Sequence, residues 1–348
     1  MSAPAVSICV PTFDGASVLQ ECLESALNQT FTDFELLIVD DASKDETVAI
    51  ASRYARLDSR VRVVTHTHNL GLSGNWNRCI DLSRGQWLKY LFQDDRLEPK
   101  CLSDMLQACV PGTFLVACRR TLLADPSASP KLIRVYESYV AEHNLPRRFP
   151  GMSLIPAKAF ASHMVDYPVA NCIGEPTAIL LHREAFNLYG RYHPDLVQLI
   201  DWEYAARIAV HRGLCYVDTP LITFRIHERS STSLNQTGVR SYRSNVIDPL
   251  LILHELAYSP VYEPVRQVSS QRQPPVDLQQ RLIDAVDAAA RSARDDPARQ
   301  VWTETLQRYP RLASAPPLRR LKRWATSHIR SLRHGGREAP CSSGDFRG

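Results

Sequence analysis

Long apolar runs, secretion signals and paired cysteines are missing from this sequence of 348 residues. No apolar stretch approaches the ~18 residues that a membrane-spanning helix needs. The short apolar stretch near the amino terminus meets Pro11 and Asp14, so we expect no signal peptide. The nine cysteines include no C-x-x-C pair. Because an odd number of cysteines without a signal peptide indicates a reducing compartment, we predict a cytoplasmic protein.

Several common motifs for phosphate binding and hydrolysis are also missing. The sequence has no G-x-G-x-x-G and no Walker lysine loop, which disfavours a dehydrogenase or a P-loop NTPase. It has no G-x-S-x-G, which removes the commonest α/β-hydrolase interpretation. The 44% of hydrophobic and 22% of charged residues are ordinary for a globular protein with one large domain or two smaller ones.

Positive charge is concentrated in the basic tail, residues 311–348. Its residues 311–337 carry eight Arg or Lys and no acid. The whole chain has a net charge of +4, so the rest nets −4, which argues against a nucleic-acid-binding body. Leu318, Leu321 and Trp324 would share one face of a helix in this tail. This pattern predicts peripheral contact with an anionic membrane surface; a solvated, partly disordered tail is the alternative.

Strand and helix patterns alternate in the first third of the chain. The strands are expected at residues 6–10, 34–39, 61–64, 87–92 and 113–118. The helices are expected at residues 18–27, 74–83 and 99–109, with another opened by the capping box Ser43-x-x-Glu46. This alternation with short connections predicts an α/β fold with a mostly parallel sheet flanked by helices.

The pattern is looser after residue 120. We expect an irregular stretch at 125–168, where Pro, Ser and Arg are frequent, and a linker at 267–275. Between them we expect strands at 177–181, 215–217 and 221–226 and a helix at 202–211 that ends at Gly213. Residues 276–309 read as helical, which predicts a helical carboxyl-terminal extension.

Acidic residues follow three of the predicted strands. Asp94 and Asp95 come directly after one of them, Asp40 and Asp41 after another, and Asp14 follows the first strand. Ligands bind at the carboxyl ends of strands in such sheets, and paired carboxylates there suit Mg²⁺ or Mn²⁺ shared with substrate phosphates. The alternative is that Asp94 or Asp95 caps the helix that follows. Like charges that converge in one crevice repel one another, so a cation or hydrogen-bond donors must offset this repulsion.

Four motifs together resemble the family-2 inverting glycosyltransferases with the GT-A fold. They are VSICVPTFD at residues 6–14, SALNQT at 25–30, ELLIVDD at 35–41, and NLG…NWN…FQDD within 69–95. The resemblance covers roughly residues 5–235 and implies a nucleotide-sugar donor, a divalent metal (Mg²⁺ or Mn²⁺) and direct displacement at the anomeric carbon. The Gln-x-x-Arg-Trp motif and the membrane helices of processive relatives are missing. We therefore expect transfer of a single sugar to a glycan or lipid hydroxyl.

The resemblance implies roles for residues of the donor site. Pro11, Thr12 and Phe13 would line the base and ribose pocket. Asp40 would accept a hydrogen bond from the imide N–H of uracil or thymine, so the donor would be a UDP- or dTDP-sugar. Asp94 would touch the ribose and Asp95 would ligate the metal. This chain has Phe92 where many relatives carry an additional Asp, which leaves a shortened acidic motif.

The resemblance also implies a general base and a second metal contact. Asp201 best matches the family's base, with Glu203 as the substitute candidate; the alternative is that Asp201 caps the helix at 202–212. His227 would complete the metal's coordination or contact the diphosphate, whereas a lone His is more often structural.

The resemblance, together with the helical pattern and the basic charges after it, divides the chain into four parts. These are a nucleotide-sugar half at 1–118, an acceptor and catalytic half at 119–235, a helical extension at 236–310 and the basic tail at 311–348. A non-catalytic nucleotide-sugar-binding or scaffold protein on the same fold is the main alternative. A nucleotidyltransferase would need a Gly-rich, basic loop after the first strand, and Pro11-Thr-Phe-Asp-Gly15 is not one.

Overall fold

The computed structural model describes residues 3–313, and its first four strands form a parallel sheet in the order β3-β2-β1-β4. The strands are β1 (Val6–Thr12), β2 (Phe34–Asp40), β3 (Val61–Thr65) and β4 (Trp87–Tyr90). The helices that connect them are α1 (Leu19–Leu27), α2 (Thr47–Leu57) and α3 (Gly71–Leu82). Every residue of β1 and β2 is buried, which explains their continuous apolar runs. The predicted α/β fold is confirmed.

The sheet becomes mixed in its second half, where the order continues β8-β6-β9-β5. The strands are β5 (Arg96–Leu97), β6 (Leu115–Ala124), β7 (Leu154–Ile155), β8 (Ile179–His182) and β9 (Leu214–Ile226). β8 runs antiparallel to β4 and β6, whereas β6 and β9 are parallel. The two strands expected at 215–217 and 221–226 are one strand, because β9 continues through a register shift opposite Arg119.

Helices occupy much of the stretch between β5 and β9. They are α4 (Cys101–Gln107), α5 (Pro130–Glu142), α6 (Leu145–Arg148), α7 (Ala157–Asp166), η1 (Pro176–Ala178), α8 (Glu184–Tyr189) and α9 (Ile200–Arg212). The expectation of an irregular stretch at 125–168 is therefore wrong. Ser129 caps α5 by accepting the N–H of Leu132, and Pro130 is its first residue. The Ser and Pro that suggested a loop are helix-start residues.

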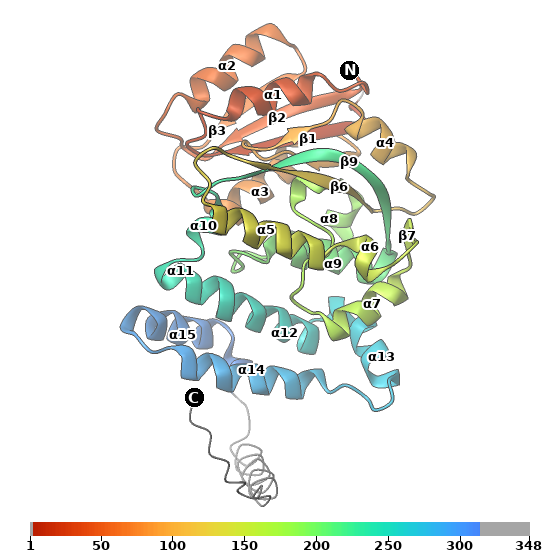
Figure 1. Ribbon diagram of the computed structural model, residues 1–348, viewed down its shortest axis with the longest axis vertical. Coiled ribbons are helices and arrows are strands. Elements are labelled where there is room, and N and C mark those ends of the chain that lie inside the picture. The colour runs from red at the N-terminus through yellow and green to blue at the C-terminus, as the bar shows by residue number, and fades with distance from the viewer. Residues whose placement is uncertain (1–2, 314–348) are drawn as a thin grey trace, which may run out of the picture.

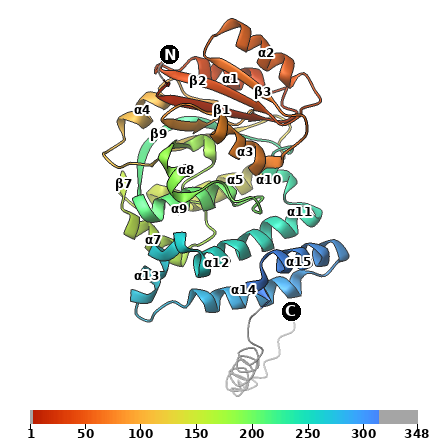
Figure 2. The same cartoon turned by 180° about the vertical axis from the view of Figure 1, so that it is seen from behind.

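Helices α10–α15 follow β9 and form a layer beyond the sheet. They and the short turns between them are α10 (Ser231–Leu234), α11 (Gly238–Tyr242), η2 (Arg243–Ile247), α12 (Asp248–Tyr258), η3 (Pro260–Tyr262), α13 (Glu263–Gln271), α14 (Leu278–Ser292), α15 (Asp296–Arg308) and η4 (Pro310–Leu312). Figures 1 and 2 both place α12, α14 and α15 at the end of the molecule away from β1–β3. The expected linker at 267–275 is partly wrong, because α13 continues to Gln271.

No helix within residues 3–313 is long and apolar enough to cross a membrane. The basic tail lies outside the described residues from position 314 onward. The last described residues belong to the helical layer, because Leu312 is buried against Leu250 and Leu282.

Candidate active site

A cavity of about 1230 Å³ lies between the two halves of the sheet and the helices after β9. Of the predicted site residues, Pro11, Thr12, Phe13, Asp94, Asp201 and His227 line it. These residues come from β1, the end of β4, the start of α9 and the end of β9. The structure therefore brings together most of the predicted site, whereas Asp40, Asp95 and Glu203 are not on the cavity wall.

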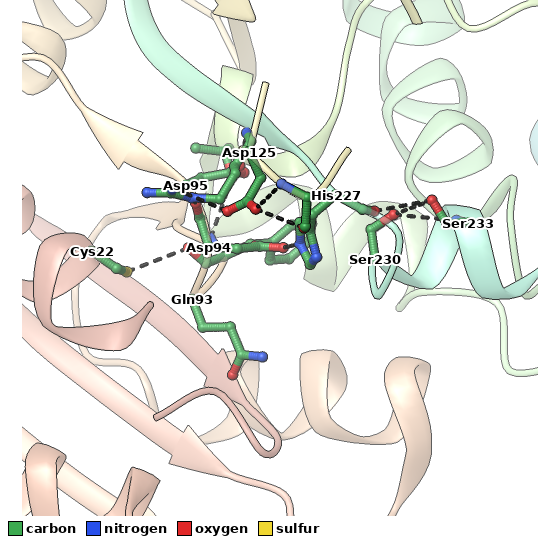
Figure 3. A network of polar contacts seen from close by, with 12 residues as sticks. Cys22, Gln93, Asp94, Asp95, Asp125, His227, Ser230 and Ser233 are labelled. Atoms are coloured by element: carbon green, nitrogen blue, oxygen red, sulfur yellow. Dashed lines mark hydrogen bonds and ion pairs between the residues drawn. The ribbon is translucent and has the colours of Figure 1, made fainter. Parts of the chain in front are cut away.

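Asp94 and His227 face each other at the cavity edge (Figure 3). The Asp94 Oδ2 and His227 Nε2 atoms are 2.8 Å apart, and the two side chains are 22% and 16% exposed. Helix α4 is capped by neither of the paired carboxylates, since its N-cap is Lys100 and no side chain caps it. The capping alternative for this acidic pair is therefore wrong.

Asp95 lies beneath this pair and is 1% exposed. Its Oδ2 accepts a hydrogen bond from the Thr177 hydroxyl at 2.6 Å, and its Oδ1 accepts one from the Arg225 backbone N–H at 3.1 Å. Burial, with the neighbouring Asp94 charge, raises the pKa of Asp95 well above its usual value. Asp95 thus ties the end of β4 to η1 and β9. Its predicted role as a metal ligand stays a prediction, and Asp94 has the better access to the cavity.

Asp40 is also buried, at the end of β2. Its carboxylate accepts hydrogen bonds from the Thr12 hydroxyl at 2.9 Å, the Ser43 N–H at 2.9 Å and the Ser43 hydroxyl at 2.5 Å. Ser43 therefore does not cap α2, and the predicted capping box is wrong. Protein donors already surround Asp40, so its contact with a base stays a prediction.

The other acids at the strand ends are also satisfied by backbone donors. Asp41 accepts the N–H groups of Leu70 and Gly71, at 2.7 and 3.0 Å, where α3 begins. Asp14 accepts the Lys44 N–H at 2.7 Å. Hydrogen-bond donors therefore relieve part of the repulsion that the sequence implies at this edge of the sheet.

Phe13 offers an exposed aromatic ring at the cavity, with 47% of the residue accessible. Its backbone is held by the Gln93 side-chain amide, which accepts the Phe13 N–H at 2.9 Å and donates to the Phe13 carbonyl at 3.0 Å. Gln93 directly precedes Asp94, so the aromatic ring and the Asp94–His227 pair are positioned by the same loop.

Asp201 lies in the first turn of α9 and lines the cavity. Its Oδ1 accepts the Trp202 N–H at 2.7 Å, and the Asn171 amide Nδ2 lies 3.5 Å from its Oδ2. Burial raises the pKa of Asp201 to about 7. A carboxylate with such a pKa is matched to accepting a proton near neutral pH.

The backbone N–H groups directly before α9 are bound by Asp248 and not by Asp201. Asp248, at the start of α12, is fully buried, and its Oδ2 accepts the N–H groups of Val197, Gln198 and Leu199 at 3.0, 2.6 and 2.9 Å. The N-cap of α9 is Leu199, so the alternative that Asp201 caps this helix is wrong.

Glu203 points away from the cavity and is 1% exposed. Its Oε1 accepts hydrogen bonds from Arg207 Nε at 2.9 Å and from the Tyr262 hydroxyl at 2.8 Å. This arrangement ties α9 to η3 and gives Glu203 a structural role.

Arg120 and Glu175 form a further charged pair on the cavity wall that the sequence reasoning missed. The Arg120 Nη1 and Glu175 Oε2 atoms are 2.8 Å apart, and the Arg120 side chain is 9% exposed. Within residues 3–313, the buried Arg120 Nε and Glu175 Oε1 have no hydrogen-bond partner. Two consecutive arginines in the apolar run of β6, Arg119 and Arg120, are the sequence signal for this site.

A divalent metal would find two protein ligands here, Asp94 and His227. No cluster of three or more His, Cys, Asp or Glu side chains suited to a metal exists among residues 3–313. Mg²⁺ commonly keeps several water ligands and binds through one or two carboxylates plus substrate phosphates. A carboxylate and an imidazole at one cavity edge fit a metal held jointly with a diphosphate.

Comparisons with known proteins indicate the family to which this chain is similar. Residues 7–160 match the family described as Glycosyl transferase family 2. EpsH of Bacillus subtilis, which is provisionally named a glycosyltransferase, is 29% identical over 254 residues, covering 70% of this chain and 69% of EpsH.

Two solved structures share the fold. TarS 1-349 from S. aureus in complex with UDP-GlcNAc has a TM-score of 0.55 at 16% identity, over 82% of this chain and 80% of that chain. The mannosyltransferase PcManGT from Pyrobaculum calidifontis, in complex with GDP-Man and Mn²⁺, has a TM-score of 0.53 at 18% identity, over 92% and 84%.

Proposed function

Because the chain belongs to glycosyltransferase family 2, we propose that it transfers one sugar, with inversion, from a UDP- or dTDP-sugar to a hydroxyl acceptor. The observation that carries this proposal is the shared cavity, which has the Asp94–His227 pair on one side and the Asp201 carboxylate on another. With a divalent metal bound, the Asp94–His227 pair would suit a diphosphate, and the Asp201 carboxylate would suit an attacking hydroxyl. The acceptor would belong to glycan or glycolipid biosynthesis.

The donor half would lie against β1 and β4. The exposed Phe13 ring offers a face for the nucleotide, and Thr12 and Pro11 line the same wall. Asp94 and His227 would hold Mg²⁺ or Mn²⁺, which when bound offsets negative charge on the leaving diphosphate. The exposed Arg229, two residues after His227, also lines the cavity and supplies positive charge near the same group.

The acceptor hydroxyl would react beside Asp201. Its oxygen attacks the anomeric carbon opposite the leaving group, so that one C–O bond forms while the bond to the diphosphate breaks, and the configuration inverts. The proton of the hydroxyl passes to the Asp201 carboxylate, whose raised pKa of about 7 makes it a stronger base than an exposed carboxylate. A binding or scaffold protein would not need this carboxylate, so its position favours catalysis.

Donor hydrolysis tests the proposal without knowledge of the acceptor. UDP-, dTDP- and GDP-sugars would be incubated with the protein in Mn²⁺ or in EDTA, and release of the nucleoside diphosphate measured. We expect slow, metal-dependent release from a uridine or thymidine donor. Absence of both release and UDP binding in the presence of Mn²⁺ would contradict the proposal.

A further inference from the structure

Helix α5 has an apolar face that residues 3–313 leave unburied. Leu132, Val135, Tyr136, Tyr139 and Val140 recur at the spacing of one helix face, and all five line the cavity. No residue of the helix is buried, and Val135 and Tyr139 are 56% and 41% exposed. Surface helices normally direct such a face toward the core, so this one is built to be covered by something in the cavity.

The apolar surface continues on other walls of the same cavity. Side chains from the loop after α7, the start of α9, α10 and the start of α12 contribute to it, namely Val169, Leu199, Ile200, Leu234 and Pro249. The Phe224 ring of β9 lies 5.5 Å from the Tyr136 ring between their centroids. Figure 1 shows α5 crossing the middle of the view, between β6 and β9 above it and α11 and α12 below it.

This apolar face leads to the candidate base. The Tyr139 hydroxyl oxygen accepts the Asn171 backbone N–H at 3.1 Å, and the Asn171 amide in turn lies 3.5 Å from Asp201. The buried Arg120–Glu175 pair, whose Nε and Oε1 atoms have no partner within residues 3–313, lines the cavity nearby. A molecule lying along α5 would therefore have apolar contacts along its length and polar contacts beside Asp201.

We infer that the acceptor carries its reacting hydroxyl on an alkyl chain or on a sugar attached to one, and that the chain lies along the exposed face of α5. This inference rests on the proposed function and specifies its acceptor. From Leu132 to Val140 the apolar row is about 12 Å long, at about 1.5 Å per helical residue. That length suits an extended aliphatic chain better than a single aromatic ring. Bare sugar acceptors would leave the row exposed to water.

Binding of three glucosides that differ only in the aglycone tests the inference. Methyl, p-nitrophenyl and octyl β-glucoside would be titrated into the full chain by ligand-observed NMR, below the micelle concentration of the octyl compound and with or without UDP and Mn²⁺. We expect octyl glucoside to bind at least tenfold more tightly than methyl glucoside. Val135→Asp should remove this difference. Ser138→Asp places the same charge on the same helix outside the cavity and should keep it.

The outcomes separate this inference from the proposed function. The inference would be overturned if methyl and octyl glucoside bound equally. It would also be overturned if Val135→Asp and Ser138→Asp lost the preference for octyl glucoside to the same extent. In either case, UDP binding would still support a glycosyltransferase. If the p-nitrophenyl glucoside bound most tightly, the acceptor would carry an aryl group, and the inference of an alkyl chain would be wrong. A dimer that dissociates in Val135→Asp would show that a second copy covers the face. Failure of both UDP and dTDP to bind in Mn²⁺, together with absence of donor hydrolysis, would contradict the proposed function, whichever glucoside bound best.

Discussion

Two adjacent carboxylates, Asp94 and Asp95, should respond in opposite ways to the same substitution. Asp95→Ala removes an acceptor from the fully buried Thr177 hydroxyl and from the Arg225 N–H. Each buried donor left without a partner costs about 1–3 kcal/mol, so the loss of folding free energy should be about 2–6 kcal/mol. At about 2 °C per kcal/mol for a large domain, the Tm should fall by about 4–12 °C.

Asp94→Ala should leave the fold almost unchanged. The partner of its carboxylate is His227, and both side chains are partly exposed. Solvent-exposed ion pairs contribute about 0–1 kcal/mol. This pair is only partly exposed, so its contribution should lie near the upper end of that range and the Tm should fall by about 2 °C. If Asp94 is the metal ligand, the variant loses stabilisation of the leaving group that is typically worth several kcal/mol. Metal-dependent turnover should then fall on the order of 100-fold or more.

The assay is thermal unfolding of both variants, paired with donor hydrolysis in Mn²⁺. Wild-type protein in EDTA shows how much activity depends on the metal. An Asp95→Ala variant with unchanged Tm and no metal-dependent activity, beside an active Asp94→Ala, would refute this reasoning. It would restore Asp95 as the metal ligand.

Other variants test the proposed base Asp201, the Arg120–Glu175 pair and the basic tail. Asp201→Asn should lower turnover on the order of 10²–10⁴ while UDP still binds by titration; Glu203→Gln should instead lower the Tm, and the reverse pattern would move the base to Glu203. Because Asp201 accepts a proton only when ionised, wild-type turnover should rise with pH through about 7, and a profile flat from pH 5 to 9 would contradict this role. Gly174→Ala should lower activity and stability, because Gly174 has φ +120° and an added Cβ would lie 2.3 Å from Arg120 Nη1. Gly112→Ala is the control for backbone strain alone, since Gly112 has φ +85° and an added Cβ there would meet no atom within 4 Å. The full chain should sediment with anionic vesicles at low salt, whereas a chain ending at Ala313, which keeps the buried Leu312, should not; equal sedimentation of the two would remove the membrane role.

The sequence predicted the first half of the fold well, because β1 and β2, which are buried throughout, are continuous apolar runs followed by acidic residues. It missed α5, since Leu132, Val135 and Tyr139 face a cavity and the flanking Ser129 and Pro130 are also common in loops. It placed both Asp94 and Asp95 at the donor, whereas only Asp94 lines the cavity. This difference depends on Thr177 and β9, which are distant in sequence and reach the end of β4 only in the folded sheet.

The same dependence on distant contacts makes the helical layer part of the candidate active site. Asp248 is the first residue of α12, yet it accepts three backbone N–H groups directly before α9 and so fixes the turn that carries Asp201. Tyr262 of η3 holds Glu203 one half-turn further along the same helix. The resemblance to the family ends at about residue 235, before Asp248 and Tyr262. The position of the proposed base is instead set by residues after β9, where no motif predicts a catalytic contribution.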